Sequence, residues 1–354
     1  MKLPLDSSKY FDFETYIESL SSKELEEYID NFSLLDPAID FDYRVEVGSS
    51  VDLWTTILTK GKVTDKILKD LLASNAITID AIYDMLNANP LEHVSESVLA
   101  EILAWGSDYV ESRRPNDGIT AGWYIAKDVS NKLLLDWVHL LDIKAFSDAG
   151  RLTPEMLEAY INTMSTMDSV KGFSSADSAT LLALQKKARV FKVFALFGEL
   201  NGLNSDTAQD RHAYKEPYIT TEPSTKLSLD NILVFEKHLE AAGDESLLLK
   251  FYNVVAVKQY MPTNYWLSVV AKRPSILENL WSSAVTAILY KCQFTEDFLE
   301  THIKALYMNI VIASQVVSLD FVFKHKAEIS CTDFFYLNPY IDKKIKLKYK
   351  LLMS

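Results

Sequence analysis

The sequence repeats one helix-start pattern along most of its length. In each copy, an apolar residue precedes a Ser or Thr, and a second apolar residue follows four positions after it. The hydroxyl can accept a hydrogen bond from an unpaired amide of the first helical turn, and the two apolar residues can pack together as a hydrophobic staple. Eight starts of one kind predict a predominantly all-α fold. They are Leu20/Ser21/Leu25, Val63/Thr64/Leu68, Ile77/Thr78/Ile82, Val94/Ser95/Leu99, Leu152/Thr153/Leu157, Leu227/Ser228/Ile232, Phe294/Thr295/Leu299 and Val317/Ser318/Val322.

The spacing of these starts predicts short helices that stack on one another. Thr64, Thr78 and Ser95 lie 14 and 17 residues apart, and Thr295 and Ser318 lie 23 apart. A short amphipathic helix leaves an apolar face that a neighbouring helix must cover, which is the principle of helical-repeat proteins. Because the spacing varies, we expect an irregular, helical-repeat-like array of short capped helices.

Two segments near the C-terminus share more than the helix start. Residues 294–303 read FTEDFLETHI and residues 317–326 read VSLDFVFKHK. The pair resembles short tandem helical repeats of uncharacterised bacteriophage and large-DNA-virus proteins, whose helices begin with Leu-Ser-x-x-Phe-Ile-x-x-His. The resemblance covers residues 291–340, implies a viral, bacteriophage-type origin and carries no catalytic residue. The matching positions are Phe294, Thr295, Phe298, Leu299 and His302, then Val317, Ser318, Phe321, Val322 and His325.

Two polar stretches interrupt the helical pattern. Residues 111–122 contain turn signals, and residues 201–226 include two prolines and show no helical period. We therefore expect an acidic N-terminal helical body at 1–200, a polar loop or linker at 201–226, C-terminal helical repeats at 227–340 and a basic tail at 341–354. Alternation of lysine and apolar residues in the tail fits either a minor β element, as a short edge strand, or a basic amphipathic segment.

The charge of the chain narrows the partners it can have. With 36 basic and 49 acidic residues the net charge is −13, which disfavours broad binding to nucleic acid. Residues 1–50 hold four bases and twelve acids, a net of 4 − 12 = −8. This region is a solvated acidic face, a surface for a protein partner with a basic patch, or a mimic of nucleic acid, and the candidate residues are Glu24, Glu26 and Glu27.

Motifs that carry catalysis or cofactor binding are missing from the sequence. There is no HExxH, CxxC, GxGxxG, GxxxxGK[ST] or GxSxG pattern. The spacing of Cys292, His302, His325 and Cys331 matches no known metal arrangement, so we predict no catalytic, cofactor-binding or metal-binding residues. Two cysteines fit a reducing compartment, and neither a signal peptide nor a membrane span is recognisable. We expect a soluble protein in the cytoplasm of the host cell, with the virion as the alternative.

An aromatic and basic cluster near the C-terminus is the second candidate interface. It comprises Phe334, Phe335, Tyr336, Tyr340, Lys343, Lys344 and Lys346. Its alternative is burial within the last repeat with a solvated tail. From these features we expect a non-enzymatic scaffold that binds a host or viral protein. The competing hypotheses are a virion structural component, an enzyme with a dispersed site, and nucleic-acid binding through the lysines between 343 and 350.

Overall fold

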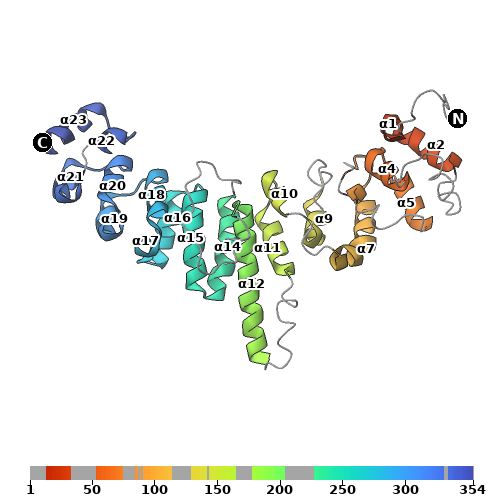
Figure 1. Ribbon diagram of the computed structural model, residues 1–354, viewed down its shortest axis with the longest axis horizontal. Helices are drawn as coiled ribbons and strands as arrows, with labels where there is room; N and C mark the ends of the chain where they lie inside the picture. The colour runs from red at the N-terminus through yellow and green to blue at the C-terminus, as the bar shows by residue number, and fades with distance from the viewer. Residues whose placement is uncertain are drawn as a thin grey trace. The chain divides into compact units, whose positions relative to one another are not determined.

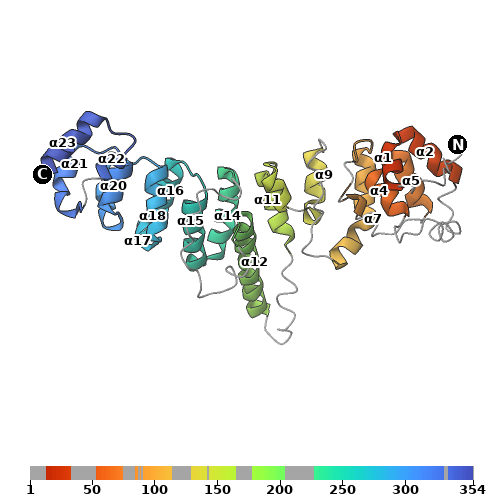
Figure 2. The same ribbon diagram turned by 45° about the horizontal axis from the view of Figure 1, so that its top comes forward.

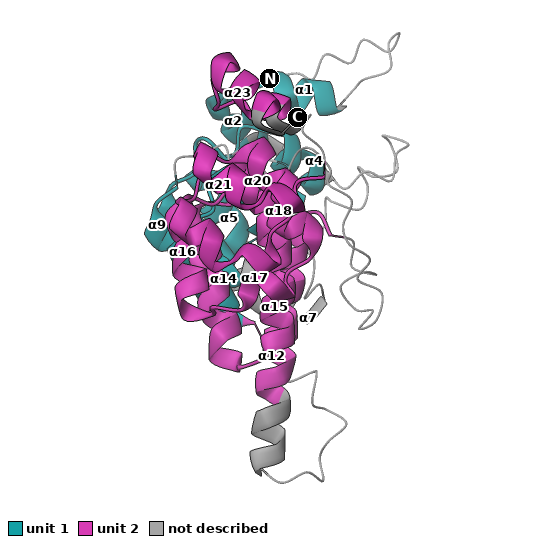
Figure 3. Cartoon of the chain, turned by 90° about the vertical axis from the view of Figure 1, so that its left-hand side faces the viewer, with its two compact units in different colours: residues 1–163 teal, residues 164–354 magenta. Residues whose placement is uncertain are grey.

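A computed structural model shows the arrangement of the helices. It describes residues 13–32, 53–74, 84–86, 88, 91–113, 129–141, 143–164, 178–203, 227–330 and 334–353. Within these ranges the chain is helical and forms no strand, although an isolated bridge pairs Thr64 with His93. The all-α prediction is therefore confirmed for the described part of the chain. The fold divides into two compact units, residues 1–163 and 164–354 (Figure 3).

The described part of unit 1 is a series of mostly short helices (Figure 1). The buried side chains come mainly from positions three and four apart, which places them on one face of each helix. The helices of unit 1 are α1 (Phe13–Ser19), α2 (Ser22–Phe32), α4 (Leu53–Lys60), α5 (Asp65–Ser74), α7 (Glu96–Arg113), α9 (Asn131–Asp136), the 3-10 helix η1 (Val138–Leu140), α10 (Ile143–Asp148) and α11 (Pro154–Thr163).

Unit 2 is an array of helix pairs (Figure 2). Helices α15, α18, α20 and α22 pack in succession. Each follows α14, α16, α19 or α21 along the chain, and we call each such two consecutive elements a helix pair. The helices of unit 2 are α12 (Ser178–Leu200), α14 (Leu229–Ala242), α15 (Glu245–Lys258), α16 (Thr263–Lys272), α17 (Ile276–Asn279), α18 (Ser282–Lys291), α19 (Glu296–Thr301), η3 (Ile303–Ala305), α20 (Met308–Ser314), α21 (Leu319–Lys324), η4 (Lys326–Glu328), α22 (Phe334–Leu337) and α23 (Lys343–Met353).

The predicted helix starts are found wherever the structure describes them. The hydroxyl of the Ser or Thr accepts a hydrogen bond from the amide three residues later at Ser21, Thr64, Thr153, Ser228, Thr295 and Ser318. Ser95 immediately precedes α7, and its flanking residues Val94 and Leu99 are buried. The start at Thr78 lies outside the described residues.

One further start obeys the same rule and was missed in the sequence. Ser130 caps α9, since its hydroxyl accepts from the amide of Leu133 at 3.4 Å. Its staple residues, Val129 and Leu134, are both buried. The pattern was therefore readable at this position before the fold was known.

A buried polar contact joins consecutive helix pairs of unit 2. Gln259 accepts a hydrogen bond from the backbone amide of Leu227 at 3.1 Å. Gln315 accepts from the amide of Phe294 at 2.9 Å. Cys292, which occupies the matching position between them, donates its Sγ–H to the carbonyl of Met261 at 3.4 Å. All three side chains are at least 98% buried, being 1%, 0% and 2% exposed in the order given. We call this contact the buried joint.

The buried joint recurs at one position of the repeat. Each of the three side chains lies three residues before the N-cap residue of the next pair. It forms its hydrogen bond with the backbone of the residue that directly precedes the N-cap of the previous pair. Gln315 also donates to the carbonyls of Leu289 and Cys292, at 2.5 and 2.8 Å, so its amide is fully used. In the last pair the same space is served by Asn338, which donates to the carbonyls of Ile312 and Gln315.

A second contact, which we call the cap bridge, occurs in both units. The carboxylate of one helix accepts a hydrogen bond from the cap residue of a later helix. In unit 1, Ser95 donates its amide to Asp65 at 2.7 Å, and Ser130 donates its amide and its hydroxyl to Glu96, each at 2.6 Å. In unit 2, Ser318 donates both groups to Glu296. Acidic residues in the first turn therefore link helices in addition to favouring their own helix dipole.

Two expectations about organisation differ from the structure. The C-terminal tail forms the helix α23 and no strand, because Asp342 precedes it as a cap and Tyr349 supplies one buried contact face. Alternation of lysine misled the prediction, since exposed lysines fit either period. Helix α12, assigned from the sequence to the N-terminal body, belongs to unit 2. Its Phe197 ring lies 5.2 Å from Phe235 and 4.6 Å from Phe251.

Replacing a joint residue should destabilise unit 2 strongly. The variant Gln315→Met keeps the side-chain volume but leaves the buried amide of Phe294 and two carbonyls unpaired, so we expect a loss of about 2–3 kcal/mol of unfolding free energy. Urea denaturation followed by circular dichroism measures it. The matched control Gln293→Met removes an exposed amide that donates to the Ser314 carbonyl at 2.7 Å and accepts from the Val316 amide at 3.3 Å. Because water can replace these bonds at an exposed site, this variant should cost about 1 kcal/mol or less. Equal losses in the two variants would contradict the joint's role.

The cap bridge predicts a coupling energy between two specific residues. Ser318→Ala should cost about 1 kcal/mol as a lost cap, and combining it with Glu296→Gln should reveal a coupling of about 0.5–1 kcal/mol. The same cycle with Asp297→Asn is the control, because Asp297 shares the first turn of α19 with Glu296. A coupling of the same size with Asp297 would mean that charge near the helix end, and not the bridge, accounts for the effect.

Candidate functional site

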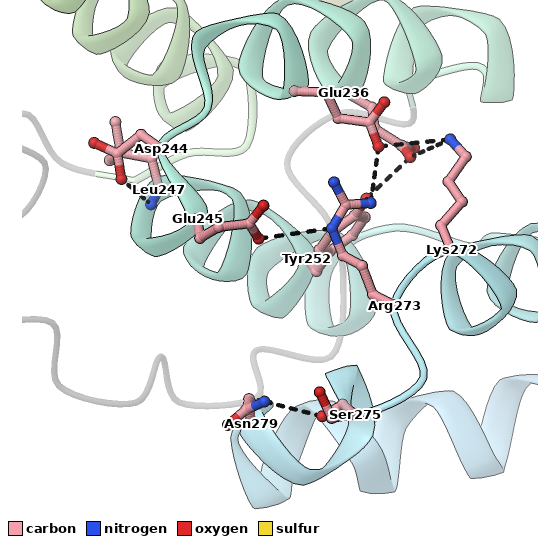
Figure 4. Close-up of polar contacts among 10 residues, drawn as sticks. Glu236, Asp244, Glu245, Leu247, Tyr252, Lys272, Arg273, Ser275 and Asn279 are labelled. Atoms are coloured by element: carbon pink, nitrogen blue, oxygen red, sulfur yellow. Dashed lines mark hydrogen bonds and ion pairs between the residues drawn. The ribbon is translucent and has the colours of Figure 1, made fainter.

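The most buried acid in the described residues that makes a polar cluster is Glu236 on α14. Its side chain is 3% exposed, and Oε1 accepts hydrogen bonds from the Tyr252 hydroxyl at 3.0 Å and the Lys272 ammonium at 3.4 Å (Figure 4). Burying a carboxylate is costly unless it is paired, and the hydroxyl of Tyr252 and the ammonium of Lys272 supply the partners of Glu236.

Two tyrosines lie against this carboxylate. Burial, followed by the negative charge of Glu236, raises the pKa of Tyr252 far above its usual value. The same two causes hold the pKa of Tyr265 well above its usual value. Both phenols are therefore neutral at any physiological pH and can act only as hydrogen-bond donors or acceptors. Glu236 Oε2 and the Tyr265 hydroxyl make no hydrogen bond within the described structure.

Ion pairs cover the outer side of the cluster. Arg273 donates to Glu240 at 2.9 Å and lies 3.7 Å from Glu245 (Figure 4). Lys272 lies 3.5 Å from Glu240. The charges nearly balance, and they connect α14, α15 and the end of α16. These contacts stabilise the packing of the three helices. The burial of Glu236 could have been predicted from its position beside the apolar residues Ile232, Phe235 and Leu239 of α14.

The repeated histidines join neighbouring helix pairs. His325 is buried, and its Nε2 lies 3.0 Å from Glu300 of the preceding pair, while its Nδ1 lies 3.2 Å from Glu328. Its ring packs on Phe321 at 4.8 Å, as His302 packs on Phe298 at 4.6 Å. Burial lowers the pKa of His302, and the charge of Glu278 in the preceding pair opposes this. The acids and histidines of the two C-terminal segments thus serve packing between pairs.

Lys291, the last residue of α18, is a half-buried cation. Its ammonium donates to the carbonyls of Ala256, Val257 and Gln259 at 2.7–2.9 Å, at the C-terminal end of α15. Burial lowers the pKa of Lys291 to about 8. The three carbonyls and the negative end of the helix dipole favour the charged form, so Lys291 acts as a helix cap.

The described members of the set Cys292, His302, His325 and Cys331 do not converge as metal ligands. In the described part of the chain, no three His, Cys, Asp or Glu side chains converge as metal ligands. Cys292 is buried, and burial raises the pKa of its thiol. His302 and His325 lie at the ends of different helices, and Cys331 lies outside the described residues.

The acidic candidates are largely engaged within unit 1. Glu24 accepts from the amide and hydroxyl of Ser21, at 2.8 and 2.6 Å, and these bonds lower the pKa of Glu24. Glu26 accepts from the Thr64 hydroxyl at 2.5 Å, which makes it a cap bridge. Glu27 is exposed, with Lys23 at 3.9 Å. Of the three, Glu27 best keeps its charge available to a partner.

The C-terminal candidates form an exposed surface. Tyr336 and Tyr340 are 47% and 55% exposed, and between them Leu337 is 64% exposed. Lys343 and Lys344 are exposed, whereas Lys346 is half-buried and donates to the Tyr336 carbonyl at 3.2 Å. Leu337 and Leu347 belong to the same region but were not among the predicted interface residues, and Lys350 was considered only in the nucleic-acid alternative. Phe334 and Phe335 open α22, and their side chains are not among those described.

Comparisons with known proteins were made on the whole chain. No family model, no curated protein and no solved structure matches it. Among the helices that the structure describes, none combines the length and the apolar character of a membrane-spanning segment.

The contact between Glu300 and its cationic neighbours predicts a dependence of stability on pH. Hydrogen bonds from Lys324 and then His325 lower the pKa of Glu300 below its value in the unfolded chain. The unfolded state therefore binds more protons near pH 4.5, and this stabilisation is lost as the pH falls through the lowered pKa. Urea midpoints measured between about pH 3 and pH 7 should fall less steeply in Glu300→Gln than in the parent chain. Asp320→Asn, at an exposed site of α21, is the comparison variant, because it removes one negative charge and keeps the contacts of Glu300 with Lys324 and His325.

Proposed function

We propose that this chain is a non-enzymatic scaffold for protein–protein interaction, encoded by a bacteriophage or large DNA virus and acting on a host or viral protein. The observation that carries the proposal is the use of polar groups in the described array. Buried amides, first-turn acids, histidines and the Glu236 cluster are engaged in contacts between helices. What the array offers to other molecules is an extended helical surface, which is how repeat proteins select partners.

The distribution of charge supports a basic partner for unit 1. Residues 1–163 hold 14 basic and 29 acidic residues, a net of 14 − 29 = −15. Residues 164–354 hold 22 basic and 20 acidic residues, a net of 22 − 20 = +2. The acidic excess of the chain therefore belongs to unit 1, where it can accelerate and orient the approach of a protein with a positive patch.

The viral part of the proposal rests on the resemblance of residues 291–340 to tandem helical repeats of phage and large-virus proteins. The helix starts at Thr295 and Ser318 match that repeat in form. Mass spectrometry of purified particles distinguishes an intracellular scaffold, absent from the particle, from a virion component present in stoichiometric amount.

The scaffold function is tested by capture of partners with the full chain. We expect the chain to retain a specific protein from host lysate at low salt and to release it at about 0.5 M salt, because exposed charges are screened. The charge variant Glu27→Gln/Glu92→Gln/Glu101→Gln alters three exposed acids of unit 1 and should weaken retention about tenfold. Failure of the parent chain to enrich any protein over this variant would reject the basic-partner form of the proposal.

A further inference from the structure

An exposed surface of mixed aromatic, aliphatic and basic character lies where α22 meets α23. We define the C-terminal surface as Tyr336, Leu337, Tyr340, Lys343, Leu347 and Lys350. The apolar members are strongly exposed: Leu337 at 64%, Leu347 at 56% and Tyr340 at 55%. Exposed apolar side chains that gather in one place mark interaction sites, whereas singly scattered ones are ordinary.

Helix geometry and two contacts place these residues together. Lys343, Lys346, Leu347 and Lys350 are spaced i, i+3, i+4 and i+7, which is one face of α23. That face meets α22, because Lys346 donates to the Tyr336 carbonyl at 3.2 Å and the Lys350 ammonium lies 5.7 Å from the centre of the Tyr336 ring. The opposite side of α23 is fixed to the array by Tyr349, which is 2% exposed and donates to the Val317 carbonyl at 2.6 Å.

The charge of this surface is strongly positive against an acidic chain. Residues 336–353 contain five lysines and one acid, Asp342, a net of 5 − 1 = +4. Asp342 accepts a hydrogen bond from the Lys344 amide at 2.7 Å, at the start of α23. The lysines that flank the exposed apolar side chains therefore outnumber the single acid of their own segment.

We propose that the C-terminal surface binds an acidic amphipathic helix of a partner protein. Leu337, Tyr340 and Leu347 would contact its apolar stripe, and Lys343 and Lys350 would pair with its flanking carboxylates. This inference rests on the proposed scaffold function and names a second, oppositely charged partner class. The mode is an amphipathic helix packed against a helical surface, and α22 and α23 already pack against each other.

Charge favours a short acidic helix over the other anionic ligands. Nucleic acid and anionic membranes are extended polyanions, and both meet the repulsion of a chain with net charge −13. A single helix presents few charges and experiences mainly the local field, because screening limits the reach of charges to about 8 Å at physiological salt.

The experiment measures binding of a defined probe to the full chain. The probe is a fluorescein-labelled peptide of about 14 residues, four turns of helix, with leucine at helical spacing and glutamate elsewhere. Its partner probe has glutamine in place of every glutamate. We expect fluorescence anisotropy to show binding of the Glu/Leu peptide, about tenfold weaker binding of the Gln/Leu peptide, and weakening by salt.

Matched variants locate the binding site. Tyr340→Ala and Lys343→Gln/Lys350→Gln should each weaken the Glu/Leu peptide about tenfold. Tyr307→Ala is the control for Tyr340, because both tyrosines are 55% exposed. Tyr307 directly precedes α20 and is not part of the C-terminal surface. Lys304→Gln, at an exposed lysine of η3, is the control for charge. Circular dichroism verifies that all four variants retain the helical content of the parent.

Several outcomes would overturn the proposal. The first is an equal loss of peptide binding in Tyr307→Ala, and the second is equal affinity for the Gln/Leu peptide. The third is that the chain binds phosphatidylserine vesicles or a single-stranded oligonucleotide but not the peptide, and that Tyr340→Ala abolishes this binding. Self-association in sedimentation experiments that Tyr340→Ala abolishes would identify a second copy as the occupant. If the peptide fails to bind while the full chain still captures a salt-sensitive partner from lysate, this inference falls and the scaffold function stands.

Discussion

A buried side chain that reaches the backbone of the previous helix pair holds the array of unit 2 together. Gln259, Cys292 and Gln315 do this at one position of successive pairs, and Tyr349 continues the series by donating to the Val317 carbonyl. The connections between pairs carry amides and carbonyls that no helix satisfies, and leaving them buried and unpaired would cost free energy. The joint meets this need and fixes the register of one pair on the next.

The same economy explains why the apparent catalytic groups are structural. Glu296 stabilises the start of α19 and bridges to Ser318, and Glu300 meets His325 across the next pair. Glu236 of α14 accepts hydrogen bonds from Tyr252 of α15 and Lys272 of α16, and so links three helices. Each group lies in a contact between helices, so the acid–histidine pairs recur because the helix pair recurs. Surfaces, and not polar clefts, are therefore where recognition by this chain is to be sought.

The two candidate surfaces differ in the sign of their charge and in how much of each could be predicted from the sequence. The acidic character of unit 1 was readable from composition, but the structure engages Glu24 and Glu26 and leaves Glu27 exposed. The C-terminal aromatic and lysine cluster was also readable, and Tyr336, Tyr340 and Lys343 are indeed exposed. Leu337 and Leu347 were not predicted as interface residues, and Lys350 was considered only for nucleic-acid binding, because membership of that surface depends on how α23 lies against α22.

The sequence by itself determined where helices begin. A cap and its staple span six residues, so their physics is local, and a helix begins at each predicted start that the structure describes, and also at Ser130, where the pattern had been overlooked. Helices α16, α18 and α20 begin without a side-chain cap and were not marked by this pattern. Tertiary structure alone decided what those helices contact. The partners of Ser95, Thr64 and Gln259 lie 30, 38 and 32 residues away, and no local rule selects them. The tail shows the same division. Its alternating lysines are compatible with a strand or a helix, and the buried hydrogen bond from Tyr349 to the Val317 carbonyl favours the helix.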